Sequence, residues 1–328
     1  MKTKVFLTLL VPILIASLVS GCSTLTRQEA ASGRMTDPIV STDWLYANSQ
    51  LENLVIIDIR AATDYAAGHI PGSINEPFVT AFDPCKGPSS SWIVGTKDCL
   101  WLELPSADDL MRTIGKLGIR QDSRVVIVTA PNPKEPPFYG LANGTRVADT
   151  LIYAGVANVA ILDGGYPKWV SEKRVVTKEV PAVKSVTYRS GVNKAMFVST
   201  NDVQRRMRSA VIIDARDANV YSGLAIEPFT DKAGHIPNAK SLPAPWIWNL
   251  NLDGTYTYKD AKSLGKMASG VIGESADPRS QEIIVYCGVG GYASSWWFVL
   301  TQVLGYQNVR IYDGAAQEWA KNYDMVIQ

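Results

Sequence analysis

The sequence predicts an α/β protein made of two tandem copies of one domain, each a parallel β-sheet flanked by helices on both faces. Short apolar runs rich in Val and Ile alternate with helical segments along the chain, as expected for strands buried on both faces. The same ordered set of motifs then occurs twice, which indicates a duplicated domain. The 328 residues, 46% hydrophobic and 19% charged, suffice for two domains of ordinary size.

The predicted elements follow one order in both copies. Each copy begins with a short helix capped by a Ser/Thr-Asp pair, as at Ser41-Thr42-Asp43. A β-branched strand that ends in aspartate comes next, followed by a second apolar strand, a helix, a glycine and a last short strand. These strands are expected at 55–58, 125–128 and 159–162 in the first copy, and up to Asp214, at 283–286 and at 309–312 in the second.

The repeated motifs set the expected domain boundaries. The first domain is predicted at 37–175 and the second at 196–328, and the Val-, Lys- and Ser-rich stretch 176–195 is predicted to be the linker between them. The corresponding motifs are Val40-Ser41-Thr42-Asp43 with Val198-Ser199-Thr200-Asn201, Ile56-Ile57-Asp58-Ile59-Arg60 with Ile212-Ile213-Asp214-Ala215-Arg216, and Gly68-His69-Ile70-Pro71-Gly72 with Gly234-His235-Ile236-Pro237-Asn238.

Charge balance and the scarcity of histidine exclude several classes of function. The 32 Lys and Arg against 31 Asp and Glu give a formal charge of +1, so no basic surplus points to nucleic acid. The two histidines, His69 and His235, lie in Gly-His-Ile-Pro turns, where we expect structural roles. No histidine is therefore left over to bind zinc or to form the catalytic pair of a cysteine–histidine protease. Neither a Gly-x-Gly-x-x-Gly motif nor a P-loop is present, and no metal or cofactor is predicted.

The first 21 residues are predicted to be a signal peptide. Lys2 and Lys4 precede an apolar run, Val5–Val19, which is shorter than a membrane-spanning helix requires. The run ends in Leu18-Val19-Ser20-Gly21-Cys22, which resembles the bacterial lipobox. The resemblance implies cleavage before Cys22 and attachment of acyl chains, such as palmitate, to this cysteine. The alternative is an ordinary secreted protein with a chance cysteine at this position.

A lipidated Cys22 implies a lipoprotein of the cell envelope, held to the membrane by its acyl chains. Ser23, where some lipoproteins have aspartate, favours the outer membrane, with the protein facing the periplasm or the cell surface. Residues 22–36 then form a linker between the anchor and the first domain.

An exported location changes how the remaining cysteines are interpreted. Cys85 and Cys99 lie in a stretch rich in Gly, Pro and Ser, and in an oxidising compartment they could form a disulfide. The alternative is two free, partly buried thiols. Cys287 is left without a partner, and an unpaired cysteine in a secreted protein is a candidate reactive thiol.

The second copy places Cys287 where a parallel sheet binds ligands. Cys287 directly follows the strand 283–286, and a buried helix is expected over 294–300. The intervening residues are predicted to bind substrate: Gly288, Val289, Gly290, Gly291 and Tyr292. Glycines let backbone N–H groups turn inward, and with the helix N-terminus these groups should lower the pKa of the Cys287 thiol. The alternative is a buried structural cysteine beside a glycine turn.

The first copy lacks this arrangement. Alignment of the two second strands puts Thr129 opposite Cys287. The glycine-rich segment is replaced by Ala130-Pro131-Asn132-Pro133, and proline has no N–H to offer an anion. We therefore expect the first domain to be inactive and to form one wall of the cleft.

Taken together, these motifs resemble the two-domain rhodanese (sulfurtransferase) family. The resemblance implies that the Cys287 thiolate takes a sulfane sulfur from a donor to form a persulfide and passes it to cyanide or a thiol. Rhodanese-like phosphatases have an arginine six positions after the cysteine. Here that position holds Ala293, which disfavours phosphate-ester cleavage.

The resemblance leaves the sulfur donor open. The segment after Cys287 has no basic residue, unlike that of thiosulfate-using enzymes, and is closer to the Cys-Gly-Ser-Gly-Val-Thr-Ala loop of mercaptopyruvate sulfurtransferases. It departs from that loop at Val289, Gly291 and Tyr292. Arg216 matches an arginine that in both groups faces the donor anion; the alternative is a surface ion pair with Asp217 or Glu227. No second arginine follows, and a selenium or other sulfur oxyanion remains open as a donor.

Two functional hypotheses result from these observations. The first is an exported sulfurtransferase with Cys287 as nucleophile, acting on thiosulfate or 3-mercaptopyruvate. The second is a non-catalytic rhodanese-type module tethered to the envelope, which binds an envelope protein or senses sulfide.

Overall fold

The computed structural model describes residues 34–78, 90–96, 98–132 and 136–327, all of which belong to one unit, 33–328. The predicted signal peptide, Cys22 and Cys85 lie outside the described residues. Within the described ranges no helix has both the length and the apolar character needed to cross a membrane.

The N-terminal half forms a parallel five-stranded sheet in the order β1-β5-β4-β2-β3. Its strands are β1 (Ile39–Val40), β2 (Leu54–Asp58), β3 (Ser73–Asn75), β4 (Arg124–Val128) and β5 (Asn158–Leu162). Its helices are α1 (Thr42–Asn48), α2 (Ala62–Ala67), α3 (Ala107–Lys116), α4 (Pro137–Tyr153) and α5 (Gly165–Ser171). Ser41 caps α1 as predicted, because its hydroxyl accepts a hydrogen bond from the Trp44 amide at 3.0 Å.

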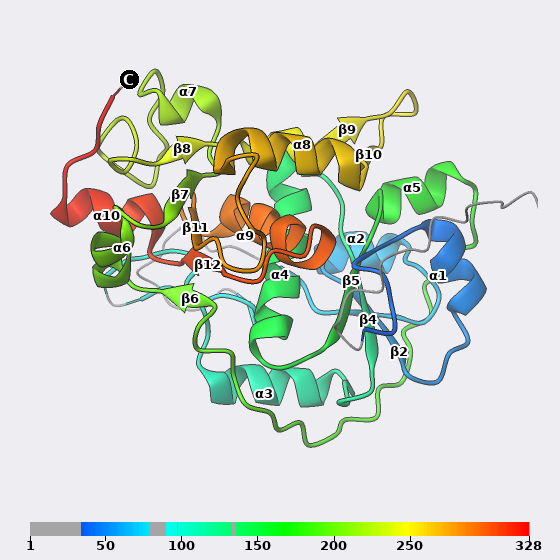
Figure 1. Ribbon diagram of the computed structural model, residues 1–328. Coiled ribbons are helices and arrows are strands. Elements are labelled where there is room, and N and C mark those ends of the chain that lie inside the picture. The colour runs from blue at the N-terminus through cyan, green and yellow to red at the C-terminus, as the bar shows by residue number, and fades with distance from the viewer. Residues whose placement is uncertain (1–33, 79–89, 97, 133–135, 328) are drawn as a thin grey trace, which may run out of the picture. The chain divides into compact units, whose positions relative to one another are not determined.

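The C-terminal half repeats this topology, with strand order β6-β12-β11-β7-β8 (Figure 1). Its strands are β6 (Phe197–Val198), β7 (Val211–Asp214), β8 (Lys240–Ser241), β11 (Ile283–Tyr286) and β12 (Val309–Tyr312). Its helices are α6 (Thr200–Arg206), α7 (Ala218–Tyr221), α8 (Ala261–Ile272), α9 (Gly291–Phe298) and α10 (Ala315–Asn322). A short turn, η2 (Ala244–Ile247), leads into a hairpin of β9 (Trp248–Leu250) and β10 (Tyr256–Tyr258). The duplication predicted from the sequence is confirmed strand by strand.

Alternate residues of each strand enter different cores, as the two-residue period of a strand requires. In β4, Val126 and Val128 pack with Leu45 of α1 and Trp169 of α5, whereas Val125 lies in the cluster that includes residues of α3 and α4. In the second sheet, one face is covered by residues of α6 and α10 and the other by residues of α8 and α9. Both sheets therefore have helices on both faces, as predicted.

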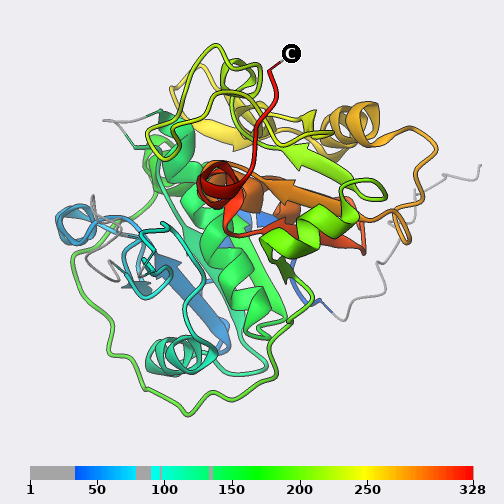
Figure 2. The same cartoon turned by 90° about the vertical axis from the view of Figure 1, so that its left-hand side faces the viewer.

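The two halves share one hydrophobic core along α4 and α9, which lie against each other (Figure 2). The Thr145 hydroxyl of α4 lies 2.7 Å from the Ser294 hydroxyl and 2.9 Å from that of Ser295 in α9. Every residue of α9 from Tyr292 to Phe298 is buried. The predicted helix over 294–300 begins three residues earlier, at Gly291, and continues as a π-helical turn, η3 (Val299–Val303). The helix that follows Cys287 is thus held by the other half of the molecule.

The segment between the halves follows the outside of the N-terminal half without forming a helix or strand between Ser171 and Phe197. The Val186 amide donates to the carbonyl of Gly115 in α3 at 2.9 Å. A Cβ on Gly115 would lie 2.3 Å from the Val186 carbonyl oxygen, so only glycine permits this approach.

Candidate active site

Cys287 lies at the carboxyl end of β11, the central strand of the second sheet. β11 pairs with β7 and β12 and ends at Tyr286, so Cys287 is the first residue beyond the sheet. We call residues 287–292 the Cys287 loop. The loop turns into α9 through Gly290, whose φ of +93° strongly favours glycine. The side chain of Cys287 is a free thiol, and only 2% of the residue is exposed.

The backbone of the loop is directed at the sulfur atom. The Gly290 amide donates to Cys287 Sγ at 3.1 Å, and the amides of Val289 and Ala293 also act on it as hydrogen-bond donors. The prediction of inward-facing amides is therefore confirmed. Such donors stabilise negative charge on sulfur, in a thiolate or in the terminal sulfur of a persulfide.

The prediction of a low pKa for the Cys287 thiol is wrong. Burial raises the pKa of Cys287 to about 11, the Glu227 carboxyl acts in the same direction, and the three amides only partly oppose them. The sequence revealed the amides, which lie next to Cys287 in the chain. It did not reveal how deeply the sulfur is buried or that the Glu227 carboxyl acts on it electrostatically.

Glu227 comes from the segment between α7 and β8 and packs on the loop. A Cβ on Gly288 would lie only 2.4 Å from Glu227 Oε2 and 3.1 Å from a ring carbon of Phe229, so this contact requires the glycine. Glu227 is 7% exposed, and burial raises the pKa of its carboxyl to about 7. The sequence suggested Glu227 only as a surface partner of Arg216. The available signal was an acidic residue between Ile226 and Pro228-Phe229.

Arg216, predicted to face a donor anion, is buried in a structural ion pair. Its Nη2 lies 2.6 Å from Asp214 Oδ2 and donates to the Gly234 carbonyl at 2.7 Å, and the residue is 1% exposed. Its other terminal nitrogen, Nη1, lies 3.9 Å from Glu227 Oε2. The N-terminal half has the same arrangement, in which Arg60 binds Asp58 and the Gly68 carbonyl. These contacts tie the end of a strand to the Gly-His-Ile-Pro turn in both halves.

Aromatic rings from both halves surround the loop. Tyr292 stacks on Tyr139 of α4 with ring centroids 4.9 Å apart, and Phe229 packs against Trp101 at 5.3 Å. Val289 and Tyr292, two predicted substrate-binding residues, are 8% and 3% exposed. The N-terminal half therefore contributes a wall beside Cys287, as the sequence suggested.

A charged contact missed by the sequence reasoning lies under the loop. Arg146 of α4 and Asp313, which follows β12, have Nη1 and Oδ1 2.7 Å apart, and Asp313 Oδ2 accepts from the Leu104 amide at 2.8 Å. A Cβ on Gly290 would lie 3.3 Å from Asp313 Oδ1 and 3.4 Å from Arg146 Nη1. The signal in the sequence was an arginine in a helix whose one other charged residue is Asp149.

Thr129 follows β4 just as Cys287 follows β11, which agrees with the alignment of the two halves. Its hydroxyl donates to the Gly140 carbonyl at 2.6 Å, and the residue is 4% exposed. A threonine in this position offers no thiol. Cys99 is disulfide-bonded; its predicted pairing with Cys85 falls partly outside the described residues and stays a prediction.

Both histidines have the structural roles expected. His69 Nδ1 lies 2.9 Å from the Tyr65 carbonyl oxygen, and its ring stacks on Tyr65 at 3.7 Å. His235 makes the same two contacts with Tyr221, at 2.9 and 3.8 Å. Within the described part of the chain, no three His, Cys, Asp or Glu side chains are grouped so as to hold a metal ion.

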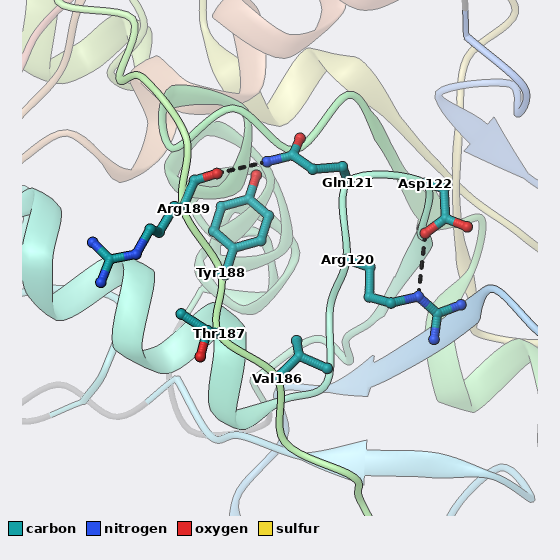
Figure 3. Close-up of a pocket in the computed structure, with 7 residues that line it drawn as sticks. All are labelled: Arg120, Gln121, Asp122, Val186, Thr187, Tyr188 and Arg189. Atoms are coloured by element: carbon teal, nitrogen blue, oxygen red, sulfur yellow. Dashed lines mark hydrogen bonds and ion pairs between the residues drawn. The ribbon is translucent and has the colours of Figure 1, made fainter.

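A surface pocket of about 480 Å³ lies away from this site, between residues 120–122 and 186–189 (Figure 3). Gln121 Nε2 donates to the Arg189 carbonyl at 2.9 Å across it, and Arg120 pairs with Asp122. No residue of the Cys287 loop lines this pocket.

Comparisons with known proteins agree with this architecture. The chain matches the family "Rhodanese-like domain" twice, at residues 41–172 and 199–322. It is 28% identical to a "Putative thiosulfate sulfurtransferase" of Saccharopolyspora erythraea, over 86% of this chain and 92% of that protein. It is also 28% identical to the "Sulfur carrier protein TtuD" of Thermus thermophilus, over 86% of this chain and 93% of that protein.

Among solved structures, the chain resembles the anaerobic ergothioneine biosynthesis enzyme of Chlorobium limicola. The TM-score is 0.70 at 19% identity, over 89% of this chain and 71% of that one, a likeness of fold alone. The family match covers both halves of the chain. The matches to relatives named as sulfurtransferases cover nearly the full length of those relatives. The chain thus belongs to the rhodanese-like family, with two rhodanese-like domains, and is a sulfurtransferase rather than a non-catalytic module.

Proposed function

We propose that this protein is an exported sulfurtransferase that moves a sulfane sulfur from thiosulfate or 3-mercaptopyruvate through a Cys287 persulfide to cyanide or a thiol. The observation that carries this proposal is the Gly290 amide, which donates to Cys287 Sγ at 3.1 Å, together with the amides of Val289 and Ala293. These donors would stabilise the charge of a persulfide anion, and they belong to the domain that has the cysteine.

The reaction divides into two transfers. In the first, Cys287 Sγ attacks the sulfane sulfur, a sulfur–sulfur bond forms, and the donor's bond to that sulfur breaks with its electron pair leaving on the donor. In the second, cyanide or a thiolate attacks the terminal sulfur of the persulfide and Cys287 leaves as thiolate. No external oxidant or reductant is consumed.

The identity of the donor is the finer part of the proposal. Relatives named for thiosulfate support that donor. The absence of basic residues from 288–292 and the Glu227 carboxyl beside Gly288 are unfavourable for a dianion and support mercaptopyruvate, which carries a single carboxylate. The experiment that tests the activity should therefore compare the two donors.

The location proposed is the cell envelope, with lipid on Cys22 and the outer membrane as the destination. Residues 1–22 support it by their resemblance to a lipoprotein signal. The disulfide at Cys99 supports an oxidising compartment, because disulfides are rare in reducing cytosol. Palmitate labelling of the parent and of Cys22→Ser in a bacterial host tests this point. Label that is equal in both would contradict it.

The activity is tested on the detergent-solubilised full chain by intact mass. Incubation with thiosulfate, and separately with mercaptopyruvate, should add one sulfur, which cyanide then removes as thiocyanate. Cys287→Ser should gain none. A Cys287→Ser protein that transfers sulfur at the parent rate would refute the assignment.

A further inference from the structure

One carboxylate oxygen that packs against Gly288, the residue after Cys287, has no hydrogen-bond partner among the described residues. Glu227 Oε2 is buried, and no donor among the described residues binds it. An unsatisfied buried oxygen costs about 1–3 kcal/mol or more when charged, so its retention next to Gly288 calls for a reason other than stability.

Charged and titratable groups from several elements face this carboxyl. Arg216 favours its ionised form from 3.9 Å, whereas Asp214 at the end of β7 and Asp217 at the start of α7 disfavour it. On the loop side, Cys287 and Tyr292 interact electrostatically with Glu227. Burial raises the pKa of this carboxyl most, and together with these charges it brings the pKa to about 7.

The thiol needs a proton acceptor. Its pKa of about 11 means that Cys287 is protonated near neutral pH, and Sγ cannot attack efficiently until that proton leaves. Histidine, the usual acceptor, is absent from the site, because His69 and His235 lie in the two Gly-His-Ile-Pro turns and stack on Tyr65 and Tyr221. Glu227 Oε2 is buried against Gly288 with no hydrogen-bond partner among the described residues, and its carboxyl acts electrostatically on Cys287, so it can accept this proton.

We propose that Glu227 is the general base of the sulfurtransferase, taking the proton of Cys287 as Sγ attacks the donor. This inference rests on the proposed function. In the first transfer the Sγ–H bond breaks and an O–H bond forms on Glu227, while the new sulfur–sulfur bond forms and the donor's bond breaks. When the acceptor removes the terminal sulfur, Cys287 leaves as thiolate and recovers the proton from Glu227. Protons and electrons therefore balance over the cycle.

A second role for the same carboxyl predicts the opposite result. If Glu227 were only a like charge that suppresses ionisation of Cys287, its removal would lower the thiol pKa and speed the attack. If Glu227 is the base, its removal still lowers the thiol pKa but slows the attack. Measurement of both quantities in one variant separates the two roles.

The test compares Glu227→Gln with the parent full chain. The thiol pKa is read from the pH dependence of alkylation by iodoacetamide, and persulfide formation from single-turnover mixing with thiosulfate and with mercaptopyruvate. We expect a lower thiol pKa, a loss of about 100-fold in the persulfide-forming rate near neutral pH, and disappearance of the rise in that rate around pH 7. A rate that is unchanged or increased in Glu227→Gln would overturn the inference.

Two further variants serve as a second test and as a control. Glu227→Asp keeps a carboxylate at a greater distance, so the rise of the persulfide-forming rate around pH 7 should remain, with a reduced rate. Loss of that rise in Glu227→Asp would count against the proposal even if Glu227→Gln failed to fold. Glu274→Gln removes an exposed carboxylate from the same domain and should react as the parent does. If the parent itself forms no persulfide, the proposed function and this inference both fall, whereas a fully active Glu227→Gln removes this inference alone.

Discussion

Arg146 of the N-terminal domain and Asp313 of the C-terminal domain form a buried ion pair directly beneath the Cys287 loop, with 2.7 Å between Nη1 and Oδ1. Both come from elements that pack around the loop: α4 in one domain and the turn after β12 in the other. The domain that lacks a catalytic cysteine thus supports the loop of the domain that has one.

The first prediction concerns this pair. Arg146→Met should destabilise the protein by about 3–5 kcal/mol, because it leaves the Asp313 carboxylate buried without its partner. Persulfide formation should fall as well, since Gly290 rests against both side chains. Urea denaturation measures the first effect and single-turnover mixing the second. The control is Arg112→Met, which breaks an exposed pair with Asp109 and should cost less than about 1 kcal/mol. Equal losses in the two variants would contradict the prediction.

A second prediction follows from Glu103, which lies near the same pair. Burial and then the Asp313 carboxylate raise the pKa of Glu103 from 4.5 to about 9. The folded state therefore holds a proton that the unfolded chain releases, so this group's contribution to stability is full below about pH 4.5 and is lost as the pH rises to about 9. Glu103→Gln should reduce the fall in melting temperature between these pH values, by roughly 2–4 °C.

Glu172 provides a control of opposite sign for that measurement. Partial burial acts to raise its pKa, but hydrogen bonds from Thr42, Arg174 and Lys168 prevail and lower it to about 2. Its contribution is present above about pH 4.5 and is lost as the pH falls towards 2. Glu172→Gln should therefore destabilise the protein at neutral pH and much less in acid. If both variants showed the same pH profile, the burial of Glu103 would not be the cause.

The third prediction separates backbone strain from loss of the sulfur site. Gly290→Ala places a side chain at φ +93°, which should cost about 1–2 kcal/mol, and should misdirect the amide that binds Cys287 Sγ. Gly254→Ala imposes similar strain, at φ +81°, in the hairpin of β9 and β10, where a Cβ meets nothing within 4 Å. Gly290→Ala should lose at least as much stability as Gly254→Ala, because its Cβ would also lie 3.3 Å from Asp313 Oδ1. Only Gly290→Ala should lose activity, by at least about tenfold. Comparable activity in the two would argue against the amide.

The fourth prediction addresses the inactive domain. Thr129→Cys, made in a Cys287→Ser background, should gain no sulfur from thiosulfate or mercaptopyruvate. The residues that follow are Ala130 and Pro131, and Pro131 has no N–H to direct at a sulfur atom. Intact mass is the readout, with the parent as positive control. A persulfide on the new cysteine would show that a thiol at the strand end is sufficient by itself.

Local sequence patterns predicted the elements well. The strands at 283–286 and 309–312 have the predicted bounds, and those predicted at 55–58, 125–128 and 159–162 each begin one residue earlier. These segments are short and apolar, and they are bounded by turn residues, so their neighbours in the chain largely decide their structure. Inward-facing amides in the Cys287 loop were predictable for the same reason.

The contacts of Arg216 could not be predicted from such local patterns. The sequence placed it beside the strand end, and the structure agrees, but its guanidinium is committed to Asp214 and the Gly234 carbonyl. The same contacts made by Arg60 to Asp58 and Gly68 mark this motif as a structural feature of both domains. Equivalent motifs in the two copies were visible in the sequence. The copy that contains Arg60 has Thr129 in place of the cysteine, so the arginine of this motif is present even where the thiol is not.

By itself, the amino-acid order determined the duplicated α/β architecture, the position of Cys287 directly after a strand and the presence of Thr129 at the equivalent position of the first copy, because each depends on residues close together along the chain. Only the tertiary structure decided how acidic the Cys287 thiol is, which carboxyl lies against Gly288, and which arginine supports Gly290 from the other domain. Those properties depend on solvent exclusion and on distances between remote segments, which arise only when the chain folds: Glu227 reaches Gly288 within the C-terminal half, and Arg146 reaches Gly290 from the other half.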